Sequence, residues 1–171
     1  MRVYLIGYMG VGKTTIGKKL AKRLGLKFID LDAYIASGEY LSIPQMMTEV
    51  GEGYFRTIEQ QYLWEVAKKE NVLISTGGGA PCFFENMTVI NSSGVSVYLK
   101  MDEKSLVQRL KNGMDSRPLI KGKSINELEE FVNLHLAERE SFYCKAKISF
   151  DALNFNAKRM EELASLIQEM A

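Results

Sequence analysis

The stretch best suited to chemistry lies near the N-terminus, where Gly7–Thr14 reads G-x-x-x-x-G-K-[ST]. A β-prone run precedes it and an amphipathic helix pattern follows it, as a phosphate-binding loop requires. Glycines let backbone N–H groups converge on phosphate oxygens, and the helix N-terminus adds a partial positive charge. We expect Lys13 to reach the β- and γ-phosphates of a nucleotide and the Thr14 hydroxyl to ligate Mg²⁺. The full match and its flanks favour nucleotide binding over an incidental glycine-rich turn.

The same loop occurs in kinases, ATPase motors and GTP switches, and two absences argue against the switch. A GTPase normally carries D-x-x-G after a strand, where it senses the γ-phosphate, and no such tetrad occurs in this chain. The guanine-reading pattern [NT]-K-x-D is also missing. Its nearest equivalent, Leu99–Asp102, begins with a leucine that cannot make the polar contacts.

Two aspartates, Asp30 and Asp32, follow a second β-prone run at Phe28 and Ile29. In an open α/β sheet the carboxyl ends of the strands face the ligand crevice, so we expect both carboxylates there, on one side of the strand end. One would hold the water shell of a metal ion, and the other would accept a proton from a substrate hydroxyl. Taken alone, either aspartate would serve equally well as a helix cap.

Three arginines have positions that an anionic ligand would explain. Arg56 is expected in the first turn of a helix, where a cation opposes the helix dipole unless an anion is bound nearby. Arg117 lies in a polar loop and could swing onto a phosphate, and Arg139 lies on a long helix that could face the cleft. Taken alone, Arg56 and Arg139 would be surface ion pairs, the second with a neighbouring glutamate, and Arg117 a solvated loop charge.

A run of three glycines, Gly77–Gly79, ends the third β-prone run with bare backbone. Such backbone allows a substrate to approach closely, although it would equally form a tight turn. The phosphate loop, the aspartate pair, the glycine run and an Arg117–Pro118 pair follow one another in this order. Their joint occurrence favours one site over several unrelated local features.

The elements that must position these residues alternate between short apolar runs and longer amphipathic segments. Strands separated by helices predict crossover connections and a parallel sheet with helices on both faces, an α/β fold. The polar segment 112–123 shows no period and is expected to be a mobile loop. The expected strands are Val3–Ile6, Phe28–Ile29, Val72–Ile74, Val95–Leu99 and Ile148–Phe150, and the expected helices follow the phosphate loop, span Phe55–Lys69, and begin at Asp102, at the Ser124–Glu127 capping box and at Asn156.

The composition is that of an ordinary globular chain of 171 residues with a formal charge of +1. This balance provides no general attraction to nucleic acid or to an anionic membrane, so any anion site must be local. Cys82, Cys144 and the single His135 make a poor zinc set and too few cysteines for a disulfide scaffold. No apolar run approaches the roughly 20 residues of a membrane span, and the N-terminus does not read as a signal peptide. We therefore expect an unprocessed, cytoplasmic chain.

Taken together, these stretches resemble the shikimate kinases, a family among the P-loop enzymes that are similar to nucleoside monophosphate kinases. The phosphate loop is common to many kinases, whereas D-x-D, F-R-x-x-E, G-G-G and R-P-L in this order are far more specific. The resemblance runs from the N-terminus to about residue 143. The matching stretches are Gly7–Thr15, Phe28–Asp32, Gly51–Glu59, Thr76–Ala80, Arg117–Leu119 and Glu138–Tyr143.

The resemblance implies a three-layer P-loop kinase fold with a central five-stranded parallel sheet, formed by residues 1–171 as a single domain. It also implies a substrate-binding subdomain at about 32–60 and a lid at about 112–123. The implied reaction moves the γ-phosphate of ATP to the 3-hydroxyl of shikimate, giving shikimate 3-phosphate and ADP on the way to aromatic amino acids. Mg²⁺ would accompany ATP. We expect a monomer whose partners are these two small molecules, with neither nucleic acid nor membrane.

The roles of individual residues carry over by position. Lys13, Asp32 and Arg117 would be catalytic, with Asp32 as the base or orienting group for the accepting hydroxyl. Thr14 would ligate Mg²⁺, and Asp30 would hold it through water. Arg56 and Arg139 would pair with the carboxylate of shikimate. ATP would contact Gly10, Val11, Gly12, Lys13, Thr14, Thr15 and Arg117, and shikimate would contact Asp32, Arg56, Gly78, Gly79 and Arg139.

This sequence departs from the family pattern in places. Gly53 stands where the family often has Arg or Lys, and Asp115 places an acidic group in the lid near the incoming phosphates. After Phe150 only a weak version of the adenine-binding turn follows, with Arg109 as a candidate neighbour of the adenine.

Two alternatives stay open from the residues alone. A kinase of another polyol acid, such as gluconate, shares the phosphate loop but is not expected to combine D-x-D, F-R and G-G-G. A nucleotide-binding module that has lost catalysis would show damage to Lys13, Thr14 or Asp32, and these residues are intact.

Overall fold

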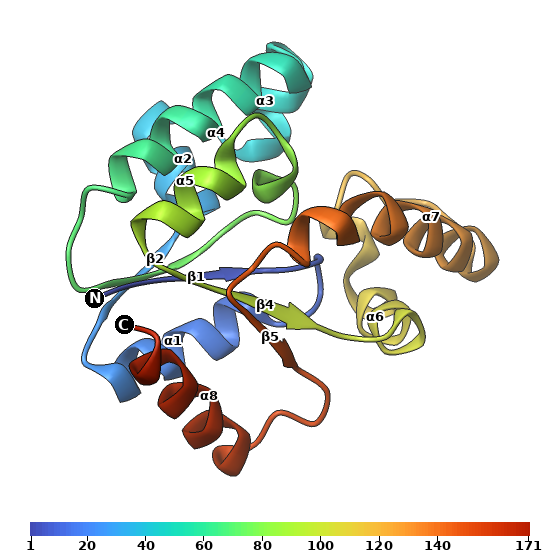
Figure 1. Cartoon of the computed structure of the whole chain (residues 1–171). Coiled ribbons are helices and arrows are strands. Elements are labelled where there is room, and N and C mark those ends of the chain that lie inside the picture. The colour runs from blue at the N-terminus through green and yellow to red at the C-terminus, as the bar shows by residue number, and fades with distance from the viewer.

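The computed structural model describes residues 1–171 and brings five strands into one sheet of order β2-β3-β1-β4-β5 (Figure 1). Every neighbouring pair is parallel, so each connection crosses over through a helical layer. The predicted five-stranded parallel sheet is confirmed. The strands are β1 (Arg2–Ile6), β2 (Lys27–Asp30), β3 (Val72–Ser75), β4 (Val95–Lys100) and β5 (Ile148–Asp151).

Helices cover both faces of this sheet, as the alternating pattern predicts. In Figure 1, α1 and α8 lie together below the sheet, α4 and α5 lie above it, and α6 and α7 stand at one side, beyond the end of β4. The helices are α1 (Lys13–Leu24), α2 (Leu31–Glu39), α3 (Ile43–Glu49), α4 (Glu52–Val66), α5 (Asn86–Ser93), α6 (Glu103–Leu110), α7 (Ile125–Tyr143) and α8 (Ala157–Glu169), with short 3-10 helices η1 (Ala80–Cys82) and η2 (Lys111–Ser116).

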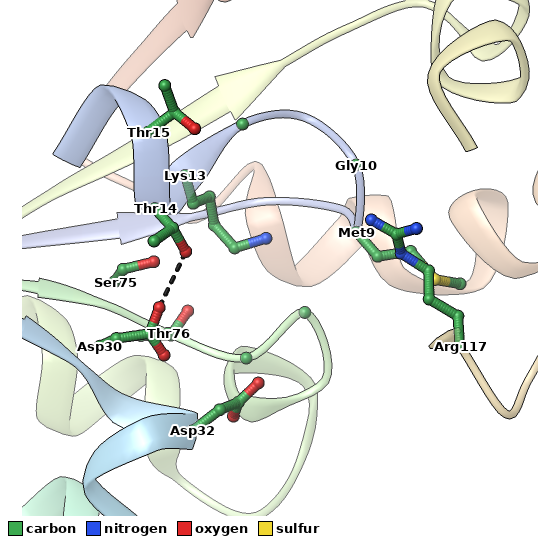
Figure 2. A pocket seen from close by; sticks show the side chains of 13 residues that line it. Met9, Gly10, Lys13, Thr14, Thr15, Asp30, Asp32, Ser75, Thr76 and Arg117 are labelled. Atoms are coloured by element: carbon green, nitrogen blue, oxygen red, sulfur yellow. Dashed lines mark hydrogen bonds between the residues drawn. The ribbon is translucent and has the colours of Figure 1, made fainter. Parts of the chain in front are cut away.

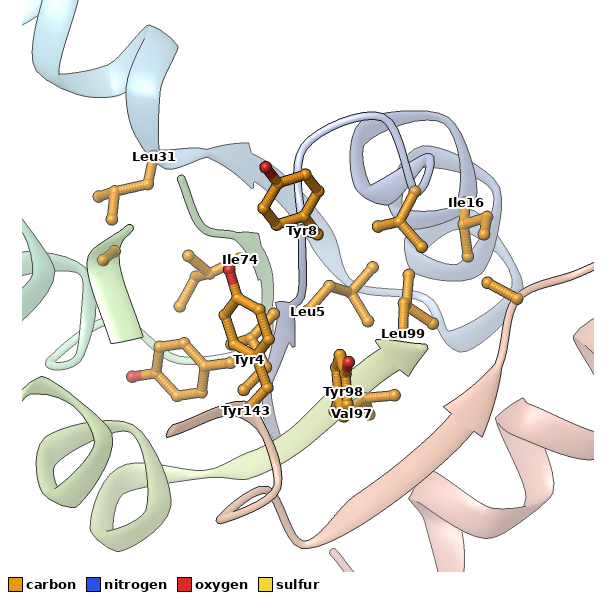
Figure 3. Packing of buried hydrophobic residues seen from close by; sticks show 14 of the residues in the cluster. Tyr4, Leu5, Tyr8, Ile16, Leu31, Ile74, Val97, Tyr98, Leu99 and Tyr143 are labelled. Carbon is orange, nitrogen blue, oxygen red and sulfur yellow. The ribbon is translucent and has the colours of Figure 1, made fainter. Parts of the chain in front are cut away.

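The core fills the two faces of the central strands. Val3–Ile6 of β1 is fully buried, as expected of a strand that is covered on both sides. Tyrosines take part in this core: Tyr4, Tyr8, Tyr98 and Tyr143 are among the largest fully buried side chains (Figure 3). Three of their hydroxyl groups form hydrogen bonds with residues that are distant in the sequence. These hydrogen bonds therefore help to fix the positions of the joined segments relative to one another.

The helix starts read from the sequence are confirmed by their caps. Asp102 accepts a hydrogen bond from Ser105 N at 2.9 Å, and Asn156 accepts one from Arg159 N at 3.1 Å. Ser124 opens α7 with a complete capping box. A second capping box, in which Ser42 and Gln45 bond reciprocally, opens α3 and was not predicted.

Several sequence-based expectations about elements are wrong. The helices α2, α3 and α5 were not predicted, and the segment expected as a loop at 112–123 contains most of η2. Helix α4 begins at Glu52, three residues before the expected Phe55, and ends at Val66. On α7, Leu134 is 63% exposed although it is apolar.

Neither cysteine is in a disulfide: Cys82 is half-buried and Cys144 is exposed, and both are free. None of the helices combines the length and the apolar character that crossing a membrane would need.

Candidate active site

The phosphate loop connects β1 to α1 with backbone that only glycine adopts easily. Gly10 has φ 81° and Gly12, the N-cap of α1, has φ 100° without any side-chain cap. The first N–H groups of α1 thus stay free to bind an anion. An open cavity of about 400 Å³ lies over the loop, lined by Gly10, Gly12, Thr14 and Thr15 among others (Figure 2). We call it the phosphate cavity.

Lys13 is buried beneath this loop rather than extended into solvent. Its ammonium group donates hydrogen bonds to the carbonyls of Gly7 at 2.7 Å and Tyr8 at 2.9 Å. Burial lowers its pKa to about 8, and the carboxylates of Asp32 and Asp30 oppose this shift. The ammonium makes no ion pair within the chain. A phosphate placed on the loop would supply the missing counter-charge.

Thr14 and Asp30 meet at the side of the phosphate cavity. The Thr14 hydroxyl donates to Asp30 Oδ2 at 2.8 Å, the dashed line in Figure 2. The other oxygen, Asp30 Oδ1, accepts from Ala33 N at 3.3 Å and so caps α2. The helix-cap alternative is therefore confirmed for Asp30, but it leaves one carboxylate oxygen facing Thr14.

Asp32 is not on the strand as expected. The strand β2 ends at Asp30, and Asp32 lies in the first turn of α2, from which its carboxylate points into the phosphate cavity (Figure 2). Burial raises its pKa, as does the negative charge of Asp30, whereas Lys13 lowers it. A Cβ on Gly77 would lie 2.7 Å from Asp32 Oδ1. The first glycine of the run therefore makes room for this carboxylate.

Arg56 lies in the second turn of α4, not the first, and is only 6% exposed. Its Nη1 donates to Glu59 Oε2 at 2.7 Å and its Nη2 to Glu52 Oε1 at 3.1 Å. The guanidinium also lies over the Phe83 ring, 4.2 Å from its centroid. The expected ion pair exists, but it is buried rather than on the surface. A Cβ on Gly79 would lie 2.5 Å from Arg56 Nη2, so this glycine is required by the guanidinium.

Glu59, the last residue of the F-R-x-x-E stretch, is a neighbour of Arg56 to which the sequence analysis assigned no role. It is 1% exposed, and its burial raises the pKa of its carboxyl to about 7, with Arg56 opposing the shift. Its only signal in the sequence is the three-residue spacing from Arg56 on one helix.

Arg139 approaches the same region from α7. Its Nη1 is 3.5 Å from the position of a Cβ on Gly78, and it forms no ion pair with Glu138 or Glu140. Glu140 instead pairs with Lys100 at 3.0 Å. Arg139 is thus a half-buried guanidinium with no acidic partner.

Two further cavities link the arginines to the phosphate loop. One of about 140 Å³ is lined by Asp32, Arg56, Arg139 and Gly77–Gly79, and it shares Asp32 with the phosphate cavity. Another of about 440 Å³ is lined by Arg56, Arg139 and His135. We call these two together the arginine cavity. The two guanidinium groups and the phosphate loop therefore border adjoining cavities that share lining residues.

The segment between α6 and α7 borders both cavities. Arg117 lines the phosphate cavity and donates through Nη1 to Gly113 O at 2.8 Å, while Leu119 lines the arginine cavity (Figure 2). Asp115 does not line the phosphate cavity but a separate one beside Lys111.

Val11 and Arg109, both expected near the nucleotide, are in contact with each other. Val11 is 1% exposed, and its side chain belongs to the hydrophobic core. Its carbonyl accepts a hydrogen bond from Arg109 Nη1 at 3.1 Å. Arg109 therefore contacts the backbone of the phosphate loop, and its expected place beside the adenine stays a prediction.

Comparison with known proteins agrees with this geometry. The family model described as "Shikimate kinase" matches residues 9–170. The chain is 54% identical to a shikimate kinase of Parabacteroides distasonis over 151 residues, which covers 88% of this chain and 87% of that protein.

Solved structures give the same result in three dimensions. The chain is similar to the crystal structure of shikimate kinase from Bacteroides thetaiotaomicron, with a TM-score of 0.90, 42% identity, and coverage of 99% of this chain and 97% of that one. It is also similar to shikimate kinase from Acinetobacter baumannii in complex with shikimate, with a TM-score of 0.84, 30% identity, and coverage of 99% and 91%.

Proposed function

The chain belongs to the shikimate kinase family, and from this membership we propose how its own residues carry out the reaction. It is an enzyme that transfers the γ-phosphate of ATP to the 3-hydroxyl of shikimate, giving shikimate 3-phosphate and ADP. Phosphoryl transfer needs little covalent help from the protein, because catalysis comes from positioning and from neutralising charge. The site must therefore align two anionic substrates.

We assign the triphosphate to the phosphate cavity. Backbone N–H groups of Gly10–Thr15 and the ammonium of Lys13 would contact the β- and γ-phosphates. The buried, unpaired charge of Lys13 supports this assignment, since an anion there restores the charge balance. Arg117 would reach the same phosphates from the lid, 112–123.

The residues present fit a magnesium ion. Thr14 Oγ1 and Asp30 Oδ2 are 2.8 Å apart, both are hard oxygen donors, and Mg²⁺ commonly takes one or two protein oxygens while keeping phosphate oxygens and water. Thr14 would bind the ion directly, and Asp30 would hold its water shell. When bound, the ion neutralises charge on the β- and γ-phosphate oxygens.

We assign the carboxylate of shikimate to Arg56 and Arg139 in the arginine cavity. Charge-assisted hydrogen bonds from two guanidinium groups distinguish a substrate with a carboxylate from a sugar that lacks one. With the carboxylate held there, the ring hydroxyls would face Asp32, and Gly78 and Gly79 would approach the ring through backbone alone. The substrate-binding subdomain would then comprise α2, α3 and the first part of α4, about residues 32–60.

Asp32 is the group placed to receive the proton of the 3-hydroxyl, or to orient that hydroxyl toward the γ-phosphate. Its raised pKa makes it a stronger base than an exposed aspartate. Closure of the lid would bring Arg117 and Leu119 over the two substrates and exclude water, which otherwise competes as the phosphoryl acceptor. A cytoplasmic location and a monomeric state remain predictions from the sequence.

The single observation that carries this proposal is that the phosphate cavity and a cavity bordered by two guanidinium groups are both lined by Asp32, Gly77 and Gly78. A coupled assay of ADP release, run with shikimate, with gluconate and with no acceptor, tests it. We expect shikimate alone to accelerate ADP release. Equal acceleration by gluconate would contradict the carboxylate-and-hydroxyl geometry proposed for the acceptor.

A further inference from the structure

Tyr143, the last residue of α7, carries a buried hydroxyl that the reaction described above does not use. The residue is 0% exposed, and its ring packs against Tyr98 with centroids 5.2 Å apart. Its hydroxyl donates a hydrogen bond to Gly78 O at 2.6 Å, across 65 residues of sequence. Burial raises the pKa of this phenol, which keeps it protonated and therefore a donor.

The acceptor lies in the middle of the glycine run, where the backbone has few other constraints. The carbonyl of Gly77 accepts from Ala80 N at 3.2 Å, and that of Gly79 accepts from Cys82 N at 2.8 Å. The carbonyl between them, on Gly78, has Tyr143 as its only hydrogen-bond donor in the chain. Because glycines stand on both sides of the Gly78–Gly79 peptide, no Cβ atom hinders its rotation. Within the turn that the Gly77–Ala80 bond closes, the hydroxyl of Tyr143 is thus the one hydrogen-bond partner of the central peptide.

Fixing the plane of this peptide also fixes where the next amide proton points. In a trans peptide the carbonyl and the N–H point in opposite directions, so the Gly79 N–H is directed away from Tyr143. Neither Gly78 N–H nor Gly79 N–H donates a hydrogen bond within the chain, and both residues line the arginine cavity. A free donor beside two guanidinium groups suits an anionic or hydroxylated ligand.

The same helix supplies the neighbouring guanidinium. Arg139 precedes Tyr143 by four residues, so the two side chains project from one face of α7. Arg139 Nη1 is already 3.5 Å from the Cβ position of Gly78. If the peptide turned over, its carbonyl would compete for this guanidinium, which the substrate carboxylate is proposed to use.

We propose that Tyr143 is a positioning residue for shikimate: its hydroxyl holds the Gly78–Gly79 peptide so that the amide proton faces the substrate and the carbonyl stays away from Arg139. This inference rests on the proposed assignment of shikimate to the arginine cavity. In this arrangement Tyr143 contacts neither substrate, so we expect its effect to be confined to the acceptor side of the site.

The test is the kinetics of Tyr143→Phe, which removes the hydroxyl and keeps the ring. We expect the KM for shikimate to rise about tenfold, while kcat and the KM for ATP stay within about twofold, because the lost interaction is made equally in the ground and transition states. Tyr143→Met, which is apolar and also lacks the hydroxyl, should show the same pattern and serves if the first variant does not fold.

A matched control is Tyr4→Phe. Tyr4 is also 0% exposed, but its hydroxyl bonds Ser93 Oγ at 2.8 Å, at the end of the sheet opposite the site. Both substitutions remove one buried hydroxyl, yet only the one at Tyr143 should change the KM for shikimate.

An unchanged KM for shikimate in Tyr143→Phe would overturn the proposal, and so would an equal rise in Tyr4→Phe. If the unmodified enzyme phosphorylated shikimate normally in these experiments, only the role of Tyr143 would fall. If it did not phosphorylate shikimate at all, the proposed function would fall with it.

Discussion

The two sides of the active site hold their cations in different ways. On the phosphate side, Lys13 is held only by backbone carbonyls of its own loop. On the carboxylate side, Arg56 is held by two glutamates, one of them almost completely buried. The phosphate side thus leaves Lys13 without an ion pair, whereas the carboxylate side pairs Arg56 with two glutamates of its own helix.

Burial disfavours the charged form of any group, so it shifts the pKa of a buried lysine and of a buried glutamate in opposite directions. Burial without an acidic partner lowers the pKa of Lys13 to about 8. Burial of Glu59 raises its pKa to about 7 even with Arg56 beside it. Burial thus shifts each group toward its neutral form, through a different partner on each side. Substitutions on the two sides should therefore have separable effects on the two substrates.

The largest effect is expected where the two sides meet, at Asp32. Asp32→Asn should lower kcat about 10³-fold, because the amide cannot accept the proton of the substrate hydroxyl. ATP affinity, measured by titration calorimetry, should stay within about twofold, since the phosphate loop keeps all its donors. Glu39→Gln on the same helix is the control, because Glu39 bonds Tyr62 and lies outside both cavities. Wild-type turnover in Asp32→Asn would remove Asp32 from the mechanism.

Substitutions of Arg56 and Arg139 should have similar effects on shikimate binding but different effects on the free energy of unfolding. Arg56→Gln and Arg139→Gln should each weaken shikimate binding by about 2 kcal/mol or more, because a carboxylate loses a charged partner. Only Arg56→Gln should also lower the free energy of unfolding, by about 3 kcal/mol, since it leaves Glu59 buried without its cation. Calorimetry with shikimate and urea unfolding measure the two quantities. Equal losses of stability would show that the carboxylate side is not held by its internal ion pairs.

Each side of the site could be predicted from the sequence only to the extent that its residues are close together along the chain. The phosphate side is one contiguous stretch, Gly7–Thr14, and its glycines, lysine and threonine report their roles by spacing alone. The parallel sheet was equally readable, because buried central strands such as β1 are continuous apolar runs. The roles assigned to individual residues stay predictions, although the structure brings Asp32, Arg56 and Arg139 to one space.

The carboxylate side was less readable because tertiary packing builds it. A glutamate is almost always exposed, so nothing marks Glu59 as buried until α4 packs beside the glycine run. The bond from Tyr143 to Gly78 spans 65 residues and leaves no local pattern. Helix α3 is different, because the Ser42–Gln45 capping box was visible and went unread. Asp32 was misplaced because α2, the helix whose first turn carries it, was not predicted.

A pH series can test the buried glutamate separately. The pKa of Glu59 rises from 4.5 in the unfolded chain to about 7 in the fold, so between these values only the unfolded chain ionises. The unfolding free energy of the wild type, relative to Glu59→Gln, should therefore fall by about 3 kcal/mol as pH rises from about 4.5 to 7, and then level off. Urea unfolding of both proteins across this range measures the difference. A difference independent of pH would mean that Glu59 stays ionised and that Arg56 outweighs its burial.

The smallest effect is expected behind the phosphate loop, at Arg109. Its Nη1 donates to Val11 O at 3.1 Å, a contact that holds the loop. Arg109→Gln should raise the KM for ATP about threefold, the loss expected for one exposed hydrogen bond, and should leave the KM for shikimate unchanged. Arg23→Gln, which removes a surface ion pair with Glu161 on the far helices, is the control. A change in the KM for shikimate would show that the two sides are not independent, because a substitution confined to the phosphate loop would then have altered the carboxylate side.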